Sequence, residues 1–305
     1  RPDSIVSEIL FDNAKQKATG VRVIDSVTKD VREYYAKIIF VCGSTVASTA
    51  LLLNSKSSRF QNGFGNDSGE LGHNLMDHHF KVGASGTWEG DEDKYYIGRR
   101  ANGIYIPRYR NIGNDKRDYV RGFGYQGGGS RQSWNRGVND MSFGSDYKDS
   151  MTKPGPWMMN LGGFGETLPY HENKMYLDPT TKDKWGIPVV VFDAEFKENE
   201  MKMRKDMMED AKEMLESAGL KNVRAFDNGS YPGMAIHEMG TARMGRDPKT
   251  SVLNGNNQLH GVKNVFVTDG ACMTSTSCVN PSLTYMALTA RAADFAVKEI
   301  KKRNL

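Results

Sequence analysis

The sequence predicts a mixed α/β fold, and three observations support this prediction. A continuous apolar run ending in glycine, AKIIFVCG at residues 36–43, precedes small residues and the helical segment ASTALLLNS at 47–55. This order of strand, small-residue turn and helix is typical of nucleotide-binding α/β domains. Alternating strand patterns lie on one side of it, and a long amphipathic helix closes the printed sequence. The expected fold class is therefore α/β combined with α+β.

The first forty residues predict strands with turns between them. SIVSEILFD at 4–12 and KATGVRVID at 17–25 have strand character, and the alternation in the second favours a half-buried hairpin strand. AKIIFVCG lacks such alternation, so it is expected to be a central parallel strand. The polar, glycine-rich segment that follows ends in GELGHNLMDHH at 69–79. Residues 80–170 mix glycines and aromatics too irregularly to assign elements.

The later half of the chain predicts a hairpin and two helices. NKMYLD at 173–178 and IPVVVFDAEF at 187–196 flank a turn, which indicates a β-hairpin or meander. A helix is expected from Glu198 to Ala218. The residues expected on its apolar face are Met201, Met207, Met208, Ala211, Met214 and Leu215.

The last residues predict a short strand followed by a long helix. VKNVFVTDG at 262–270 is apolar and ends in Asp269 and Gly270. In the segment 278–305, Asn280 is expected to cap the helix and Pro281 to take its first position. The apolar stripe of this helix is expected to run through Leu283, Met286, Ala287, Ala290, Ala293 and Phe295.

Composition narrows the classes of function. The chain has 305 residues and a net charge of +4 (41 basic minus 37 acidic residues), without the basic block expected of a nucleic-acid groove. No apolar run is long enough to cross a bilayer. For Cys42, Cys272 and Cys278 we favour buried free thiols over a Cys272–Cys278 disulfide. We expect a soluble protein, and the sequence leaves cytoplasm and periplasm open.

Two motifs invite a cofactor or metal interpretation that we do not adopt. Gly122, Gly124 and Gly127 match a dinucleotide fingerprint, but no buried strand precedes them and no helix follows, so the match is treated as chance. His73, Asp77, His78 and His79 cluster in GHNLMDHH, yet only His73 and Asp77 would share a helical face. Turn and packing roles are expected for the cluster, and no metal site is predicted.

HEMGTARMG at residues 237–245 contains the strongest candidate for chemistry. A zinc-protease helix needs a second histidine four residues after the first, and Thr241 occupies that position. His237 is then either a general base or a buried histidine whose ring is satisfied by the backbone. Residue patterns alone leave both interpretations open.

Five segments together resemble the C-terminal half of a glucose-methanol-choline (GMC) flavoprotein oxidoreductase, in the branch of sugar and gluconate dehydrogenases and pyranose oxidases. They occur in family order and cover most of the chain outside residues 80–155. The segments are FVCGSTVASTALLLNS, GELGHNLMDHH, GETLPYHENKMYLDPTTKDKWGIP, HEMGTARMG and NVFVTDGACMTSTSCVNPSLTYMALTARAADF.

The resemblance implies a two-part architecture. A partial FAD-binding, Rossmann-like domain would comprise residues 1–80 and 236–305, around an antiparallel-sheet substrate domain at 81–235. The family's N-terminal βαβ unit with its phosphate-binding glycine loop lies outside these residues. The chain is therefore expected to be a C-terminal portion, and FAD is the expected cofactor, although its retention by this chain alone is left open. The sequence departs from the family at Thr49, where members usually carry proline, and at Gly43 and Ser44, where many show Ala-Gly.

The resemblance also implies the site residues. Oxidising an alcohol by hydride transfer requires a base beside the reacting hydroxyl, and His237 matches the family's base. Asn280 matches the asparagine that hydrogen-bonds the same oxygen in the sugar-oxidising branch. Asp269, Gly270, Asn280 and Pro281 would lie against FAD.

The implied function is oxidation of a CH–OH group in a sugar, sugar acid, glycoside or polyol. Oxygen, a quinone or a protein carrier would accept the electrons, and neither the acceptor partner nor the oligomeric state is selected by the sequence. The alternative is a non-catalytic remnant that serves as a carbohydrate-binding or structural module.

Overall fold

A computed structural model describes residues 1–94, 103–132 and 143–305. The predicted substrate domain, 81–235, includes both segments that lie outside the described residues. In chain order the elements are β1 (Ser4–Asp12), β2 (Lys17–Asp25), β3 (Val31–Tyr35), β4 (Ile39–Val41), α1 (Thr45–Asn54), β5 (His79–Trp88), β6 (Gly103–Ile106), β7 (Phe123–Arg131), α2 (Ser145–Met151), β8 (Trp157–Gly165), β9 (Lys174–Lys182), β10 (Pro188–Asp193), α3 (Glu198–Ser217), β11 (Lys221–Asp227), β12 (Val265–Val267), the 3₁₀ turn η2 (Gly270–Cys272) and α4 (Ser282–Lys301).

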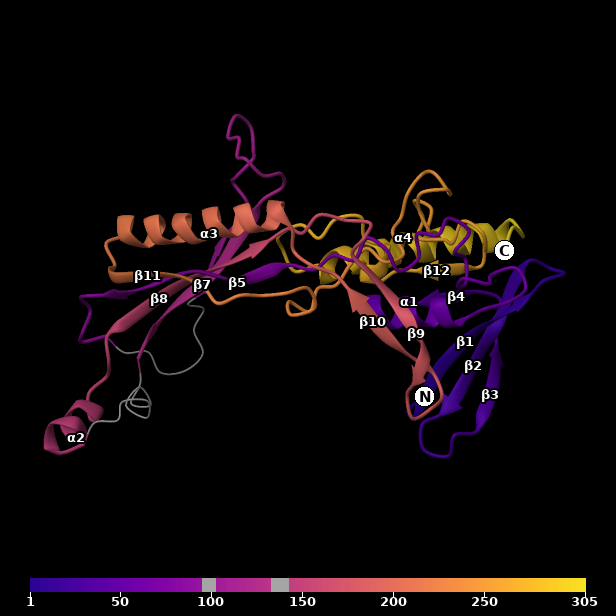
Figure 1. The fold of residues 1–305 in the computed structure, drawn as a ribbon, viewed down its shortest axis with the longest axis horizontal. Helices are drawn as coiled ribbons and strands as arrows, with labels where there is room; N and C mark the ends of the chain where they lie inside the picture. The colour runs from indigo at the N-terminus through magenta and orange to yellow at the C-terminus, as the bar shows by residue number, and fades with distance from the viewer. Residues whose placement is uncertain (95–102, 133–142) are drawn as a thin grey trace.

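The elements form two regions along the long axis of the molecule (Figure 1). One region contains α3 on the five-stranded sheet β11-β5-β8-β7-β6, whose strand pairs are all antiparallel. The other contains the antiparallel meander β1-β2-β3, the parallel pair β4-β12, and helices α1 and α4. The mixed α/β class with antiparallel sheets is therefore confirmed.

The first two predicted strands have the bounds that the sequence indicates, and the apolar run after them is parallel, as expected. Ile39 pairs with Val265 and Val41 with Val267. Within the described residues β4 pairs with β12 alone, and Phe40 on β4 is 36% exposed. The parallel orientation is thus confirmed, whereas a central position is not observed in this part of the chain.

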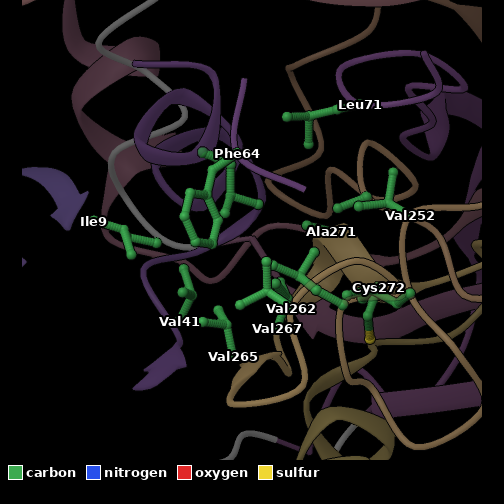
Figure 2. Packing of buried hydrophobic residues seen from close by; sticks show 14 of the residues in the cluster. Ile9, Val41, Phe64, Leu71, Val252, Val262, Val265, Val267, Ala271 and Cys272 are labelled. Atoms are coloured by element: carbon green, nitrogen blue, oxygen red, sulfur yellow. The ribbon is translucent and has the colours of Figure 1, made fainter. Parts of the chain in front are cut away.

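The parallel pair determines where the core of its region lies. Figure 2 shows side chains from β1, β4, β12 and the glycine-rich segment after α1 packing together, with Phe64 beside Ile9 and Val41. Phe64 is 1% exposed. Removing a ring of this size from a core costs about 3–5 kcal/mol, so this cluster holds the meander onto the parallel strands.

The hairpin predicted near residue 180 is present, with a longer first strand than expected. β9 continues to Lys182 and pairs antiparallel with β10. The Asp183 carboxylate accepts hydrogen bonds from the amides of Trp185 and Ile187, which closes a turn later than the sequence predicts.

Helix α3 matches its predicted bounds within a residue, and its buried face agrees with the prediction except at Met201. Met201 is 54% exposed, whereas Met203, Met207 and Leu215 are almost fully buried against the five-stranded sheet. Gly163 on β8 lets α3 approach closely, because a Cβ atom there would meet Met207 Sδ at 1.8 Å. The predicted position of Met201 on the apolar face is therefore wrong.

Helix α4 shows a larger departure. Its buried side chains are Ala292 and Ala296, which pack with Phe266 of β12. Leu283 and Met286, which the periodicity places on the core face, are 77% and 68% exposed. The small alanines lie on the packed side, where they allow the helix to approach the strand pair, and Phe295 of the predicted stripe packs beside them.

Candidate active site

His237 lies in the connection between β11 and β12, on backbone that several contacts fix. Met76 and Met239 exchange both backbone hydrogen bonds at 2.9 Å, which pairs this connection with the segment before β5. Thr45 Oγ1, at the start of α1, donates to the carbonyl oxygen of Glu238. The imidazole of His237 is half-buried, and its Nδ1 has no hydrogen-bond partner among the described residues.

The structure brings Asn280 to the other ring nitrogen. Asn280 Nδ2 lies 3.5 Å from His237 Nε2, although 43 positions separate the two residues. Gln126 of β7 donates from Nε2 to Asn280 Oδ1 at 3.1 Å. This bond leaves the amide nitrogen of Asn280 facing the imidazole, so three distant segments meet at one point.

Asn280 is not the N-cap of α4, which corrects the sequence-based prediction. Pro281 takes the N-cap position, with φ −89° and ψ −7°, and no side chain caps the helix. Because proline occupies the cap, the carboxamide of Asn280 is free to bond Gln126 and approach His237. The first helical residue is therefore Ser282, and not Pro281 as predicted.

The beginning of α4 suits the electron-rich end of a flavin ring. The first helical amides have no side-chain acceptor, Ser282, Leu283 and Thr284 are exposed, and the helix dipole favours negative charge there. His237 Nε2 and the exposed Asn280 lie at the same place. These features fit a planar group that carries an acceptor oxygen and becomes anionic on reduction.

Asp269 and Gly270 lie at the carboxyl ends of the parallel strands. Asp269 accepts hydrogen bonds from the Ala271 amide and from Ser48 Oγ, and burial raises the pKa of its carboxyl group. A Cβ atom on Gly270 would meet Thr45 Oγ1 at 2.3 Å and the Glu238 carbonyl oxygen at 2.5 Å. Glycine is therefore required there for the His237 segment to pack against η2.

One cavity adjoins the carboxyl end of β4, and another adjoins the segment that carries His237. One of about 620 Å³ extends along β4 and reaches Cys42, Gly43 and Ser48 at the strand's carboxyl end, where α/β sheets bind their ligands. Another of about 460 Å³ adjoins the segment before His237 and is lined in part by Tyr231 and Glu238. Burial raises the pKa of the Glu238 carboxyl group.

Thr49, which departs from the family pattern, has a clear structural role. Its Oγ1 lies 2.6 Å from Oγ1 of Thr241, and both residues are fully buried. Helix α1 is thereby linked by hydroxyl groups to the HEMGTARMG segment. Thr241 also occupies the position at which a zinc-protease helix would need its second histidine, so that interpretation is excluded.

The histidine cluster of GHNLMDHH has packing roles, as expected. His78 and His79 are fully buried, and the ring centroid of His78 lies 5.0 Å from that of His237, nearly perpendicular to it. Burial, then the nearby His237, lowers the pKa of His78, and burial lowers that of His79 to about 3. His73 stacks on His171 with centroids 4.1 Å apart. Among the described residues no group of three or more ligands could hold a metal ion.

The remaining sequence interpretations can also be compared with the structure. Gly124 and Gly127 lie within the antiparallel strand β7, so the dinucleotide match is indeed a chance one. All three cysteines are free thiols, but Cys42 is exposed and not buried as expected. Burial raises the pKa of Cys272 to about 12.

Gln126 is the site residue that sequence reasoning misses. It lies within the fingerprint GFGYQG that we set aside, in a stretch too irregular to assign. Only its pairing in β7, where Gln126 opposes Tyr105 and Gly162, places it beside Asn280. The available signal was one amide among glycines, which does not predict contact with the final helix.

Comparison with known proteins identifies the family. Two family models described as GMC oxidoreductase match the chain, at residues 2–80 and 169–289. Together they span more than half of its 305 residues, and the chain belongs to the GMC oxidoreductase family. The description of both models is that of an oxidoreductase family.

Its relatives include alcohol and sugar dehydrogenases. The chain is 32% identical to 2-methyl-1,2-propanediol dehydrogenase of Mycolicibacterium austroafricanum over 92% of its own length and 51% of the relative. It is 25% identical to the fructose dehydrogenase large subunit of Gluconobacter japonicus, over 99% of its own length and 54% of that relative. The chain thus spans about half the length of these relatives.

A solved structure shows the same fold. An FAD-dependent oxidoreductase from Chaetomium thermophilum aligns with a TM-score of 0.58 and 13% identity, over 99% of this chain and 62% of that one. Among the residues that the structure describes, no helix is long and apolar enough to span a membrane.

Proposed function

We propose that this chain carries the catalytic residues of an FAD-dependent oxidoreductase that oxidises a CH–OH group of a sugar, sugar acid, glycoside or polyol. The observation that carries the proposal is the meeting of His237 Nε2 and Asn280 Nδ2, 3.5 Å apart, at the exposed beginning of α4. The printed names of the relatives, a diol dehydrogenase and a fructose dehydrogenase, support a hydroxyl-bearing substrate.

In this proposal His237 acts as the general base. Its Nε2 accepts the hydroxyl proton of the substrate as the carbon is oxidised. Asn280 Nδ2 donates a hydrogen bond to the same oxygen, while Gln126 holds the carboxamide in the required orientation. FAD, when bound, supplies the hydride acceptor.

Residues around these two would hold the cofactor. Asn280, Pro281 and the free amides of α4 would face the flavin ring. Asp269 and Gly270 would line the cofactor side at the carboxyl end of β12. We further propose that residues 1–80 and 236–305 form the cofactor-binding part and residues 81–235 the substrate-binding part.

The experiment is purification of the protein from cells that make it, followed by absorbance spectroscopy with and without added FAD. We expect a flavin spectrum that bleaches when a sugar or polyol is added without oxygen. A protein that stays colourless with added FAD, yet binds sugars by calorimetry, would contradict the proposal and support the carbohydrate-binding alternative.

A further inference from the structure

The GHNLMDHH segment contributes a buried carboxylate, that of Asp77, which accepts a hydrogen bond from the backbone amide of the candidate base. Asp77 is 1% exposed and follows Met76, the residue that pairs with Met239. Its own carbonyl oxygen accepts a hydrogen bond from Thr167 Oγ1, which ties it to the end of β8. Asp77 therefore belongs to a fixed part of the molecule.

The carboxylate of Asp77 bonds backbone amides and forms no ion pair among the described residues. Oδ2 accepts from the amides of Gly233 at 2.8 Å and Ala235 at 3.0 Å. Oδ1 accepts from the amides of His78 at 2.8 Å and His237 at 3.3 Å. Since an ionised carboxylate only accepts hydrogen bonds, these four donors suit it. Three of the four come from the segment that ends at His237.

That segment is held in an unfavourable conformation. Ile236, the residue before His237, has φ +58°, a left-handed conformation that β-branched residues rarely adopt. Its side chain is 81% exposed, so packing does not explain the strain. The amides on both sides of it, those of Ala235 and His237, bond Asp77. The carboxylate thus holds the backbone where the strain is.

We propose that Asp77 is a positioning residue: its carboxylate clamps the 233–237 backbone and sets the His237 imidazole beside Asn280 before substrate binds. The inference deepens the proposed function and rests on it, because the position of His237 matters only if His237 acts as the base. A merely structural Asp77 would support the fold without affecting turnover by the folded enzyme.

The clamp is tested by amide hydrogen exchange in the 305-residue chain, without cofactor or substrate. In Asp77→Asn the amides of Gly233, Ala235 and His237 should exchange at least about tenfold faster, while the amides of β8 keep their protection. Asp178→Asn is the matched control, because Asp178 Oδ1 also accepts two backbone amides, from Thr180 and Thr181, in the distant hairpin. Exchange of the three amides within twofold of the unaltered chain would overturn the clamp.

The unaltered chain provides a second test in case Asp77→Asn does not fold. The backbone amides of Ala235 and His237 donate to Asp77, whereas the amide of Ile236 between them has no acceptor among the described residues. The clamp predicts slow, fast and slow exchange at these three consecutive amides. Equal exchange rates would overturn it.

Steady-state turnover distinguishes a positioning role of Asp77 from a purely structural one. In the flavin-loaded protein, Asp77→Asn should lower kcat about tenfold or more with KM within about threefold, because misplacing a base slows the chemical step more than binding. Asp178→Asn should change neither constant. Unchanged kcat together with faster exchange would show that Asp77 is only structural. Because exchange is measured without flavin or alcohol, a failed clamp can be distinguished from a failed proposed function.

Discussion

At the scale of single residues, the site depends on which way one carboxamide points. Asn280 Oδ1 accepts from Gln126 Nε2, so Nδ2 faces His237. Without this bond the carboxamide could turn by half a rotation and present an oxygen to the substrate hydroxyl. The role of Gln126 is therefore to select one of two nearly isosteric orientations.

Replacing Gln126 tests this selection. Gln126→Leu should lower kcat for alcohol oxidation about tenfold, because a hydrogen bond worth about 1–1.5 kcal/mol no longer fixes the donor. Steady-state kinetics of the flavin-loaded protein provide the measurement. Gln132→Leu, six positions further along the chain, is the control and should leave kcat unchanged. Equal rates in both variants would remove Gln126 from the site.

The site residues differ in how well the sequence predicts them. His237 and Asn280 are predicted through motifs that resemble a family, and the structure brings them together. Asp77 lies in a segment that resembles the family, but the sequence does not reveal its bonds to the amides of the His237 segment. The contact of Gln126 with Asn280 depends on the pairing of β7, which the sequence does not predict. Residue preferences at helix beginnings also misplace Asn280 as the helix cap, because they do not reveal that Pro281 itself takes that position.

At the scale of elements, the beginning of β5 carries a buried histidine that makes stability depend on pH. Burial, then the neighbouring Arg204 charge, lowers the pKa of His79 from 6.5 to about 3 in the folded protein. An unfolded chain binds the proton below pH 6.5, whereas the folded chain does not. The stabilising contribution is therefore present above about pH 6.5 and is lost as the pH falls from there towards 3.

Unfolding free energy measured at two pH values tests this expectation. Between pH 7.5 and 5, His79 should account for a loss of about 2 kcal/mol, the value for a proton bound only by the unfolded chain. In His79→Gln this part of the loss should disappear, although the variant is less stable at both pH values. His171→Gln, at an exposed histidine, should keep the full loss. A full loss of stability in His79→Gln would show that His79 is not the source of this pH dependence.

Another element-scale feature is the side chain that joins the meander to the parallel pair. Asn264, just before β12, is 1% exposed; it accepts from the Ala18 amide and donates to the carbonyl oxygens of Ala18 and Lys37. One carboxamide thus links β2 and the β3–β4 connection to β12.

Removing that link should destabilise the protein strongly. Asn264→Ala leaves buried backbone groups of Ala18 without partners, so we expect a loss of about 2–3 kcal/mol of unfolding free energy. Urea denaturation provides the measurement. Asn256→Ala, at a partly exposed turn residue, should change stability by less than about 0.5 kcal/mol. A similar small change in Asn264→Ala would show that the link is dispensable.

At the scale of the whole molecule, the fold class and the hairpin, parallel strand and long helices could be predicted from hydrophobic patterns. The buried face of α3 could be predicted except at Met201. The buried face of α4 could not, because periodicity does not show which side of a helix meets a sheet. Leu283 and Met286 are apolar and periodic, yet they are exposed, while small alanines make the contact. The glycine-rich strands of the five-stranded sheet were also missed, since glycine is a poor strand signal.

The proposed chemistry depends on His237 acting as a base where the two regions of the molecule meet. The most direct test is the rate of flavin reduction by a sugar or polyol, measured by anaerobic stopped flow, in unaltered protein and in His237→Ala. We predict a rate at least about a hundredfold lower in His237→Ala, with flavin still bound and with His73→Ala unchanged. A rate in His237→Ala equal to that of the unaltered protein would contradict the central claim.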